Sequence, residues 1–267
     1  MKIKGIELTV EKETLFITLY AKALDYRSKH SLLHDKMADD IIKSMDADFS
    51  QYKSLMNLTP VRARQYDDWV REFIVKEPDG AIVYLGCGMD TRVYRVDPPE
   101  SIAWYDVDFP EVIELRKAAM PPRESYHMIA SSMTEENWLM QIPASRPSLI
   151  IAEGSLEYLN ANDVKILFDR IIEHFQHGRL IFDIISTFAA ASGKDKLKET
   201  TGAVHKWVVD DISDVDKMNE KMRRDVCMPA FKSPCVKELS AGARLLCRLF
   251  SMRPKYRDMI RILSYSF

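Results

Sequence analysis

The N-terminal part of the chain repeats its apolar residues at helical spacing. Between residues 12 and 44, apolar side chains such as Leu15 and Leu19 recur every three or four positions. A second stretch, from about Pro60 to Val75, has apolar residues on one face and Arg and Asp on the other. We therefore predict a helical N-terminal extension over residues 1–78.

From residue 79 the pattern changes to short apolar runs that alternate with helical or polar stretches. Short runs that are apolar throughout are typical of parallel strands buried on both faces. We predict such strands at residues 81–85, 102–107, 126–129, 148–152 and 179–185. Helices are expected after Pro110 and over residues 163–175. This alternation predicts an α/β fold with a doubly wound, mostly parallel, Rossmann-like sheet.

The alternation ends after residue 186. Residues 187–245 are lysine-rich at first and then mixed, and we expect them to form a lid or substrate region over the sheet. The last stretch, 246–267, is expected to return to the sheet as a final strand. The chain has 267 residues and is predicted to be one domain, in which residues 79–186 form the cofactor-binding core.

Composition and charge narrow the range of partners. Hydrophobic residues make up 46% and charged residues 29%, which is typical of a globular protein and not of a disordered or membrane-spanning one. The 38 Lys and Arg residues nearly balance the 40 Asp and Glu residues, so no overall positive field favours nucleic acid or anionic lipid. The N-terminal stretch has no apolar signal region, and we expect a cytoplasmic protein.

The four cysteines are Cys87, Cys227, Cys235 and Cys247, and none of them forms a C-x-x-C pair. This spacing does not match the usual zinc or thioredoxin-type sites, so no metal site is predicted. A chain of this size can build a core without disulfides, and we therefore expect the thiols to be reduced.

Candidate chemistry begins at Gly86 and Gly88, after the first predicted strand. Ligands of doubly wound sheets bind at the carboxyl ends of strands, where glycines let the backbone approach a cofactor closely. A dinucleotide fingerprint needs a third glycine, but Thr91 stands there, and Asp90 would repel a diphosphate. The turn favours a nucleoside cofactor without a pyrophosphate, of which S-adenosyl-L-methionine (SAM) is the commonest. A tight turn without a ligand is the alternative.

The strands that follow end in carboxylates. Asp106 and Asp108 come about 20 residues after the glycine turn, where an acid binds the ribose diol in such folds. Asp108 lies nearer the loop and is our first choice, with capping of the helix after Pro110 as its alternative role. Glu153 follows the fourth strand, and because a buried carboxylate needs a partner we expect it to meet a cationic amine or sulfonium. Tyr158 is expected to line the acceptor pocket or to pack in the core.

Four segments together resemble one family. They are RARQYDDWV (62–70), YLGCGMDTRVYR (84–95), WYDVDFPEVIELRK (104–117) and LIIAEGSLEYL (149–159). The sequence is similar to the leucine carboxyl methyltransferase and polyketide-tailoring O-methyltransferase family, whose members are class I SAM-dependent methyltransferases. The resemblance covers about residues 12–186. It implies that residues 79–186 are a SAM-binding core within a single methyltransferase domain.

The resemblance also implies roles for individual residues. It implies that Arg62 binds the carboxylate of SAM through its guanidinium fork, with Arg64 as the near alternative. It implies that Lys22 assists, although a solvated helix charge is the alternative for this lysine. The other SAM contacts that the resemblance implies are Gly86, Gly88, Asp108 and Glu153.

One departure from the family pattern concerns the adenine. Many members have Asp-Leu after the third strand, whereas this chain has Ser132-Met133. We expect Ser132 to replace the hydrogen bond to the adenine amine and Met133 to pack against the ring. The departure favours the bacterial enzymes that act on small molecules over the eukaryotic phosphatase-modifying members.

The expected function is methyl transfer from SAM to a carboxylate or a phenolic hydroxyl of a small molecule. A carboxylate acceptor is already ionised at neutral pH, whereas a phenol benefits from a general base. The pattern identifies no catalytic residue; Tyr158 and His205 are the candidates, with a surface or packing histidine as the alternative for His205. Trp207 is expected to shape the pocket. The alternatives are a catalytically silent SAM-binding or scaffold protein and an NAD-type oxidoreductase. The oligomeric state is not predicted.

Overall fold

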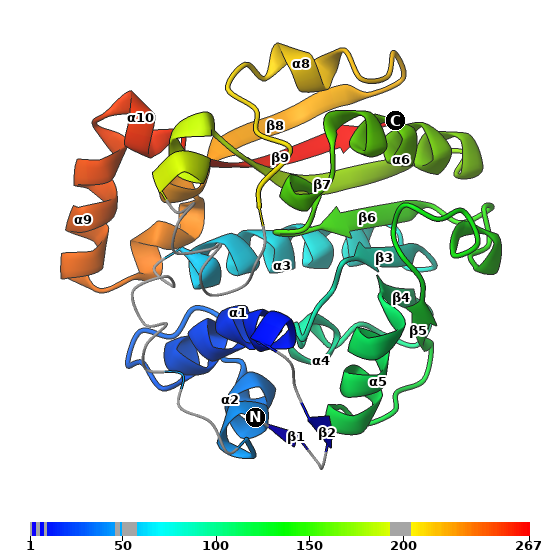
Figure 1. Cartoon of the computed structure of the whole chain (residues 1–267), viewed down its shortest axis with the longest axis horizontal. Helices are drawn as coiled ribbons and strands as arrows, with labels where there is room; N and C mark the ends of the chain where they lie inside the picture. Colours follow the sequence, from blue (N-terminus) through cyan, green and yellow to red (C-terminus); the bar gives the residue numbers. More distant parts are fainter. Residues whose placement is uncertain (1, 4–5, 8–9, 46–48, 50–57, 193–203) are drawn as a thin grey trace.

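The computed structural model describes residues 2–3, 6–7, 10–45, 49, 58–192 and 204–267 (Figure 1). Among these residues, seven strands form a sheet in the order β5-β4-β3-β6-β7-β9-β8. The strands are β3 (Ala81–Leu85), β4 (Ala103–Asp108), β5 (Tyr126–Ala130), β6 (Ser148–Ala152), β7 (Gly178–Ile185), β8 (Arg223–Pro229) and β9 (Ile260–Ser266). Strands β3 to β7 are parallel, and β9 is antiparallel to both of its neighbours. The predicted doubly wound, mostly parallel sheet is confirmed.

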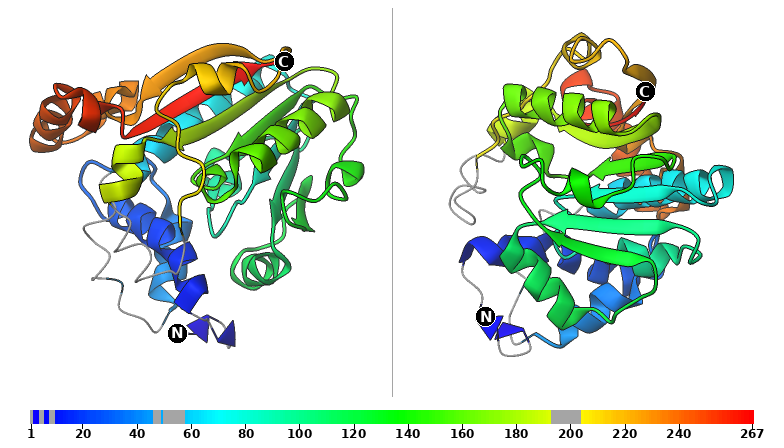
Figure 2. Two further views of the ribbon diagram at one scale, coloured as in Figure 1. Left: turned by 45° about the horizontal axis from the view of Figure 1, so that its top comes forward. Right: turned by 90° about the vertical axis from the view of Figure 1, so that its right-hand side faces the viewer.

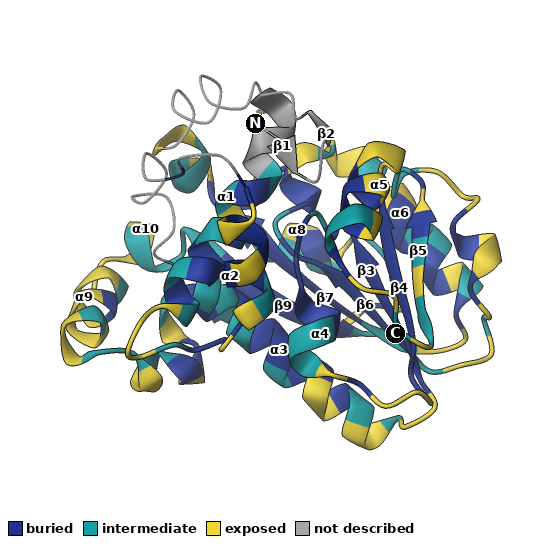
Figure 3. Cartoon of the chain, turned by 90° about the horizontal axis from the view of Figure 1, so that it is seen from below, coloured by how far each residue is buried: buried dark blue, intermediate teal, exposed yellow. Residues whose placement is uncertain are grey.

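Helices cover both faces of the sheet (Figure 2). On one face Val83 of β3 packs in a cluster with Phe168 of α6 (Ala161–His174). On the other face Tyr84 packs with Trp69 of α3 (Thr59–Lys76). Because both faces are covered, β3 is buried along its whole length, as Figure 3 shows, and this explains its unbroken apolar run.

Short connections join the parallel strands. Helix α4 (Arg92–Val96) follows β3, and α5 (Pro110–Ala119) follows β4 with its proline in the first turn, as predicted. Two 3-10 helices, η2 (Leu139–Gln141) and η3 (Leu156–Tyr158), lie before and after β6. The predicted strand positions are each correct to within one residue at either end.

The N-terminal extension packs against the end of the sheet where the glycine turn lies. It contains the hairpin β1 (Lys2–Ile3) and β2 (Ile6–Glu7), the helices α1 (Val10–Tyr26) and α2 (Lys36–Lys43), and then α3. Apolar residues of α1 and α2 share one cluster with Met89, from the turn after β3, and Leu115 of α5. This packing brings one face of α1 to the glycine turn.

The C-terminal region corrects part of the predicted lid. Strand β8 falls inside residues 187–245 but belongs to the sheet, where it pairs with β9. It is an edge strand whose residues are mostly exposed, so its sequence RRDVCMP lacks the apolar run of a central strand. The other elements are α8 (Ser213–Asp216), η4 (Ala230–Lys232), η5 (Pro234–Glu238), α9 (Ala241–Ser251) and α10 (Pro254–Arg257). Residues 193–203 of the expected lid lie outside the described residues, whereas the expected final strand is β9.

The described structure also bears on membrane spans and on disulfides. No helix in the described part of the chain has both the length and the apolarity that crossing a membrane requires. All four cysteines are free thiols.

Candidate active site

The turn after β3 holds two glycines in a backbone conformation that favours glycine, and one of them is also tightly packed. Gly86 and Gly88 have φ angles of +62° and +51°, in the left-handed region that side chains disfavour. A Cβ on Gly86 would also lie 2.7 Å from Cβ of Ser155 and 2.8 Å from Cε of Met133. A Cβ on Gly88 would meet only Leu15, at 3.6 Å. Gly86 therefore packs tightly against protein atoms, and Gly88 is the glycine with open space beside it.

Asp108 is bound to this turn. Its Oδ2 accepts a hydrogen bond of 2.7 Å from the backbone N–H of Gly88, and its Oδ1 accepts one of 2.8 Å from Phe109. Burial raises the pKa of Asp108, although both N–H groups oppose the shift. The N-cap residue of α5 is Phe109 and has no side-chain cap, so the capping role for Asp108 is wrong. Each carboxylate oxygen keeps acceptor capacity for a further donor.

Asp106, the other acid of β4, has a structural role. It forms a buried ion pair with Arg116 of α5 and accepts a hydrogen bond of 2.6 Å from the hydroxyl of Tyr126. Arg116 in turn donates to the backbone carbonyl oxygens of Gly88, at 2.7 Å, and Asp90, at 2.8 Å. Asp106 therefore anchors the arginine that shapes the turn, a role the sequence did not reveal.

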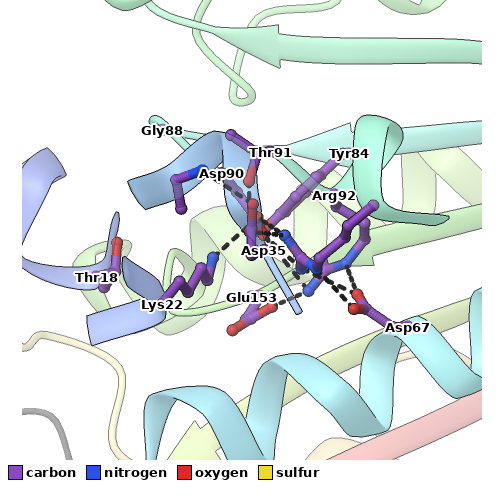
Figure 4. Close-up of polar contacts among 12 residues, drawn as sticks. Thr18, Lys22, Asp35, Asp67, Tyr84, Gly88, Asp90, Thr91, Arg92 and Glu153 are labelled. Carbon is purple, nitrogen blue, oxygen red and sulfur yellow. Dashed lines mark hydrogen bonds and ion pairs between the residues drawn. The ribbon is translucent and has the colours of Figure 1, made fainter. Parts of the chain in front are cut away.

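Lys22 lies beneath the turn in a network of buried charges (Figure 4). Its Nζ is 2.9 Å from Oδ1 of Asp90, and the residue is 2% exposed, so the solvated helix charge is wrong. Asp90 also pairs with Arg95 at 2.5 Å and with Arg92 at 3.4 Å, and it accepts a hydrogen bond from Tyr84. Burial raises the pKa of Asp90, but the positive charges of Arg95 and Lys22 outweigh this and hold it well below its usual range.

The ion pairs of Asp90 correct one step of the sequence analysis. Asp90 was expected to repel a diphosphate at the entrance of the helix. Its carboxylate instead faces three cationic side chains in the interior, which compensate its charge. Asp90 therefore does not disfavour a ligand that carries a diphosphate.

The network continues from Asp90 toward the end of β6. Asp67 of α3 is 2.7 Å from Nε of Arg92 and 2.6 Å from Nε of Arg95, so it joins α3 to α4. The other end of Arg92 forms a buried ion pair with Glu153. Glu153 is thus paired, as its position after a buried strand required. Its cationic partners are arginines of this chain.

Arg62 is the second partner of Glu153. Its Nε is 3.1 Å from Oε1 of Glu153, and its Nη1 is 2.9 Å from Oδ2 of Asp183, which lies within β7. The third nitrogen, Nη2, lies beside Gly154, where a Cβ would come within 2.8 Å of it. Asp183 also accepts hydrogen bonds from Tyr66 and from the backbone of Gly154. Two residues that were predicted separately, Arg62 and Glu153, are therefore in contact.

Arg64, the near alternative to Arg62, contacts other elements. It pairs with Asp68 at 2.8 Å and with Glu238 at 3.1 Å, and it donates to the carbonyl oxygen of Leu32. None of these contacts reaches the turn after β3, Glu153 after β6 or Asp183 in β7. The geometry favours Arg62.

Glu157, in η3 four residues after Glu153, was not among the residues predicted from the sequence. The residue is buried, and its Oε2 atom has no hydrogen-bond partner in the described part of the chain. Burial, followed by the negative charge of Asp183, raises the pKa of Glu157 to about 8. Its position in the sequence Leu156–Leu159 offers no signal beyond a carboxylate a few residues after the end of a strand.

The residues expected at the adenine lie close to the turn. The hydroxyl of Ser132 is bonded within its own turn, to Thr134 Oγ1 at 2.8 Å and to the backbone N–H of Thr134. Met133 reaches Gly86, as the packing of the turn shows, and its carbonyl oxygen accepts from Trp138. Their contacts with adenine remain predictions.

Tyr158 and His205 form an aromatic pair, with ring centroids 5.5 Å apart. Tyr158 is 36% exposed, so it is not the core aromatic that was its alternative. Burial lowers the pKa of His205, which keeps its imidazole neutral at neutral pH. Trp207 is 4% exposed and packs with Phe168 and Phe182, and its place in a pocket wall stays a prediction.

No cluster of three His, Cys, Asp or Glu side chains within the described ranges is arranged to hold a metal ion. The candidate site consists of the glycine turn, Asp108, and the Arg62 side chain with its two acids, Glu153 after β6 and Asp183 in β7.

Comparison with known proteins identifies the family. The family model for leucine carboxyl methyltransferase matches residues 9–172. The tetracenomycin polyketide synthesis O-methyltransferase TcmP of Streptomyces glaucescens is 34% identical over 273 residues, which cover 98% of each chain. The SAM-dependent methyltransferase dpfgK of Gibberella zeae is 31% identical over 231 residues, or 77% of this chain and 78% of that one.

Solved structures share the fold. A protein from Thermobifida fusca that is provisionally identified as a methyltransferase superposes with a TM-score of 0.60 at 12% identity, covering 92% of this chain and 93% of that one. At this identity the likeness concerns the fold alone. The family model and the similarity to TcmP show that the chain belongs to the leucine carboxyl methyltransferase family of class I SAM-dependent methyltransferases.

Proposed function

We propose that this chain transfers the methyl group of SAM to an oxygen atom of a small molecule, either a carboxylate or a phenolic hydroxyl. The observation that carries the proposal is the meeting of Asp108, the Gly86–Gly88 turn and the Arg62–Glu153 pair at the carboxyl ends of β3, β4 and β6. The name of TcmP, a polyketide O-methyltransferase, supports an oxygen acceptor on a small molecule.

The residues present fit the chemistry of SAM. Its ribose diol suits Asp108, whose two oxygens each have one backbone partner. Its carboxylate suits Nη2 of Arg62, with Lys22 adding positive charge nearby. Its ammonium and sulfonium suit the surplus of acids around Glu153. We propose that the Gly86–Gly88 turn, Ser132 and Met133 complete the cofactor site.

The chain mainly has to position the reactants. SAM supplies a methyl group that is already activated on a sulfonium. The protein contributes by aligning an acceptor oxygen with that methyl group and by excluding water. The buried charge network under the turn suits this task, because Asp67, Asp90 and Glu153 hold α1, α3, α4 and β6 in fixed positions around the turn.

Calorimetric titration with SAM and S-adenosylhomocysteine (SAH) tests the cofactor site, with NAD as the control ligand. We expect micromolar binding of SAM and SAH and no binding of NAD. Binding of NAD alone would favour the oxidoreductase alternative. Binding of SAM without methyl transfer to any acceptor in a broad screen of phenols and carboxylic acids would favour the catalytically silent alternative.

A further inference from the structure

Helix α9 has an apolar face that the rest of the described chain leaves exposed. With α10 it lies at one end of the molecule (Figures 1 and 2), and most of its residues are exposed, as Figure 3 shows. Leu245, Leu249 and Met252 follow one another at helical spacing and are 57%, 52% and 72% exposed. Leu246, beside them, is 56% exposed. Apolar side chains gathered in this way on a surface indicate a contact with another molecule.

The other side of α9 attaches the helix to the body of the protein. Phe250 stacks on Phe231 of η4, with ring centroids 5.5 Å apart, and meets Tyr256 of α10 edge-on at 5.6 Å. Cys247 is buried, and the hydroxyl of Ser240 caps the start of the helix. The leucines are therefore presented outward by a helix that is already folded, so binding requires no ordering of this segment.

The charged residues of this surface are all basic up to Arg257. Residues 240–257 contain no Asp or Glu, and their five basic residues are Arg244, Arg248, Arg253, Lys255 and Arg257. Arg257 pairs with Asp258 at 2.6 Å, whereas the other four form no ion pair with the residues that the structure describes. The whole chain has a formal charge of -2, so positive charge is concentrated here. An exposed helix with leucines on one face and arginines beside them is typical of attachment to an anionic lipid surface.

The size and charge of the surface favour a bilayer over a second copy of the chain. An α-helix of 11 residues is only about 16 Å long, whereas a stable protein interface buries about 800 Å² on each partner. A twofold dimer through α9 would also bring the same arginines of both copies together, with no acid of residues 240–257 to pair with them. Anionic headgroups supply the missing negative charge, and the acyl layer accepts the leucines.

We propose that residues 240–257 form a membrane-docking surface that binds this chain to bilayers containing anionic phospholipid. In this arrangement Leu245, Leu249 and Met252 enter the boundary between headgroups and acyl chains, and Arg244 and Arg248 contact lipid phosphates. The surface contains none of the residues assigned to the cofactor site. The inference therefore goes beyond the proposed methyl transfer and does not depend on it.

Cosedimentation of the full chain with lipid vesicles tests the docking surface. One set of vesicles is pure phosphatidylcholine, and the other has three parts phosphatidylglycerol to seven parts phosphatidylcholine, both in about 0.1 M NaCl. The apolar variant is Leu245→Gln with Leu249→Gln, since Gln preserves helix propensity. Its matched control is Val75→Gln with Met140→Gln, which removes two exposed apolar side chains from other elements.

A second pair of variants tests the charges. Arg244→Gln with Arg248→Gln removes two basic residues from the docking surface. Lys217→Gln with Lys221→Gln makes the same change in net charge at exposed positions elsewhere. Circular dichroism checks that every variant is folded, and SAH titration of the same samples reports separately on the proposed function.

We expect the wild type to bind the anionic vesicles much more tightly than the neutral ones, and to be released in about 1 M NaCl, where the Debye length falls to about 3 Å. The apolar variant should bind at least about tenfold more weakly, because burial of each leucine contributes to binding. The arginine variant should bind about 25-fold more weakly, or about fivefold for each arginine. Both controls should bind like the wild type.

Four results would overturn the inference. One is a folded wild type that does not bind the anionic vesicles, and another is an apolar variant that binds them as tightly as its control. The third is a wild-type dimer in analytical ultracentrifugation that the apolar variant dissociates, without vesicle binding, which would assign the surface to a second copy. The fourth is binding to poly-glutamate but not to vesicles, which would assign it to an acidic polypeptide. Loss of SAH binding with vesicle binding intact would contradict the proposed function alone.

Discussion

The buried charge network gives a prediction that separates the roles of its members. Replacing Asp90 by Asn removes the carboxylate that pairs with Lys22, Arg92 and Arg95. Arg92 keeps Asp67 and Glu153, and Arg95 keeps Asp67, so both arginines retain partners. Lys22 loses the carboxylate with which it pairs in the described structure. Its ammonium, in a residue 2% exposed, is then buried without a counter-charge.

The loss of stability expected for Asp90→Asn follows from the burial of Lys22. Removing one partner of a buried ion pair costs about 3–5 kcal/mol, because the other charge remains uncompensated. At about 2.1 cal/mol/K per residue, a chain of 267 residues has an unfolding entropy of roughly 0.56 kcal/mol/K. Asp90→Asn should therefore lower the melting temperature by about 5–9 °C. Lys22→Met should cost less, because Asp90 keeps two arginines and the hydroxyl of Tyr84.

Thermal unfolding followed by circular dichroism at pH 7 measures these effects. Asp68→Asn serves as the matched control, since Asp68 pairs with Arg64 at the surface and its loss should cost under about 1 kcal/mol. In the double variant, Lys22→Met should recover part of the stability that Asp90→Asn loses, with a coupling of about 0.5–3 kcal/mol. The reasoning is refuted if Asp90→Asn costs no more than Asp68→Asn, or if the two losses in the network simply add.

Three further predictions concern the cofactor site and its acids. Asp108→Ala should weaken SAH binding by about 1–3 kcal/mol, the worth of a charge-assisted hydrogen bond, and calorimetry showing unchanged affinity in a folded variant would contradict the ribose role. Gly154→Ala should weaken SAH binding about tenfold or more, because φ is +63° and the new Cβ meets Nη2 of Arg62 at 2.8 Å, whereas Gly242→Ala, with no atom within 4 Å, should leave affinity unchanged. The pKa of Glu157 is raised from 4.5 to about 8, so its contribution to stability is present below pH 4.5 and lost as pH rises through 8. Glu157→Gln lacks this titration, so its melting temperature relative to the wild type should rise between pH 5 and 9, by the equivalent of up to about 4–5 kcal/mol; a constant difference would show an ordinary pKa.

Short-range patterns along the chain were enough to predict those parts of the protein that depend on local structure. Strand β3 was predictable because a strand buried on both faces must be apolar throughout, and Gly86 and Gly88 because a left-handed turn requires glycine. The spacing from this turn to Asp108 was enough to select an acid that proves to be bonded to Gly88. Local motifs of this kind also carried the family resemblance, which the comparisons confirmed.

The burial of the charged side chains and the identity of their partners depend on contacts across the fold. Lys22, read from α1 alone, is one more lysine on an amphipathic helix, and its burial depends on Asp90, which lies 68 residues further along the chain. The burial of Trp207 in the core and the pairing of β8 with β9 at the sheet edge likewise depend on contacts with distant parts of the chain. Asp183 joined the site because the parallel strands β6 and β7 bring residues that are distant in the sequence together. Burial and electrostatic pairing are properties of atoms that meet across the fold, and residue order along the chain does not specify them.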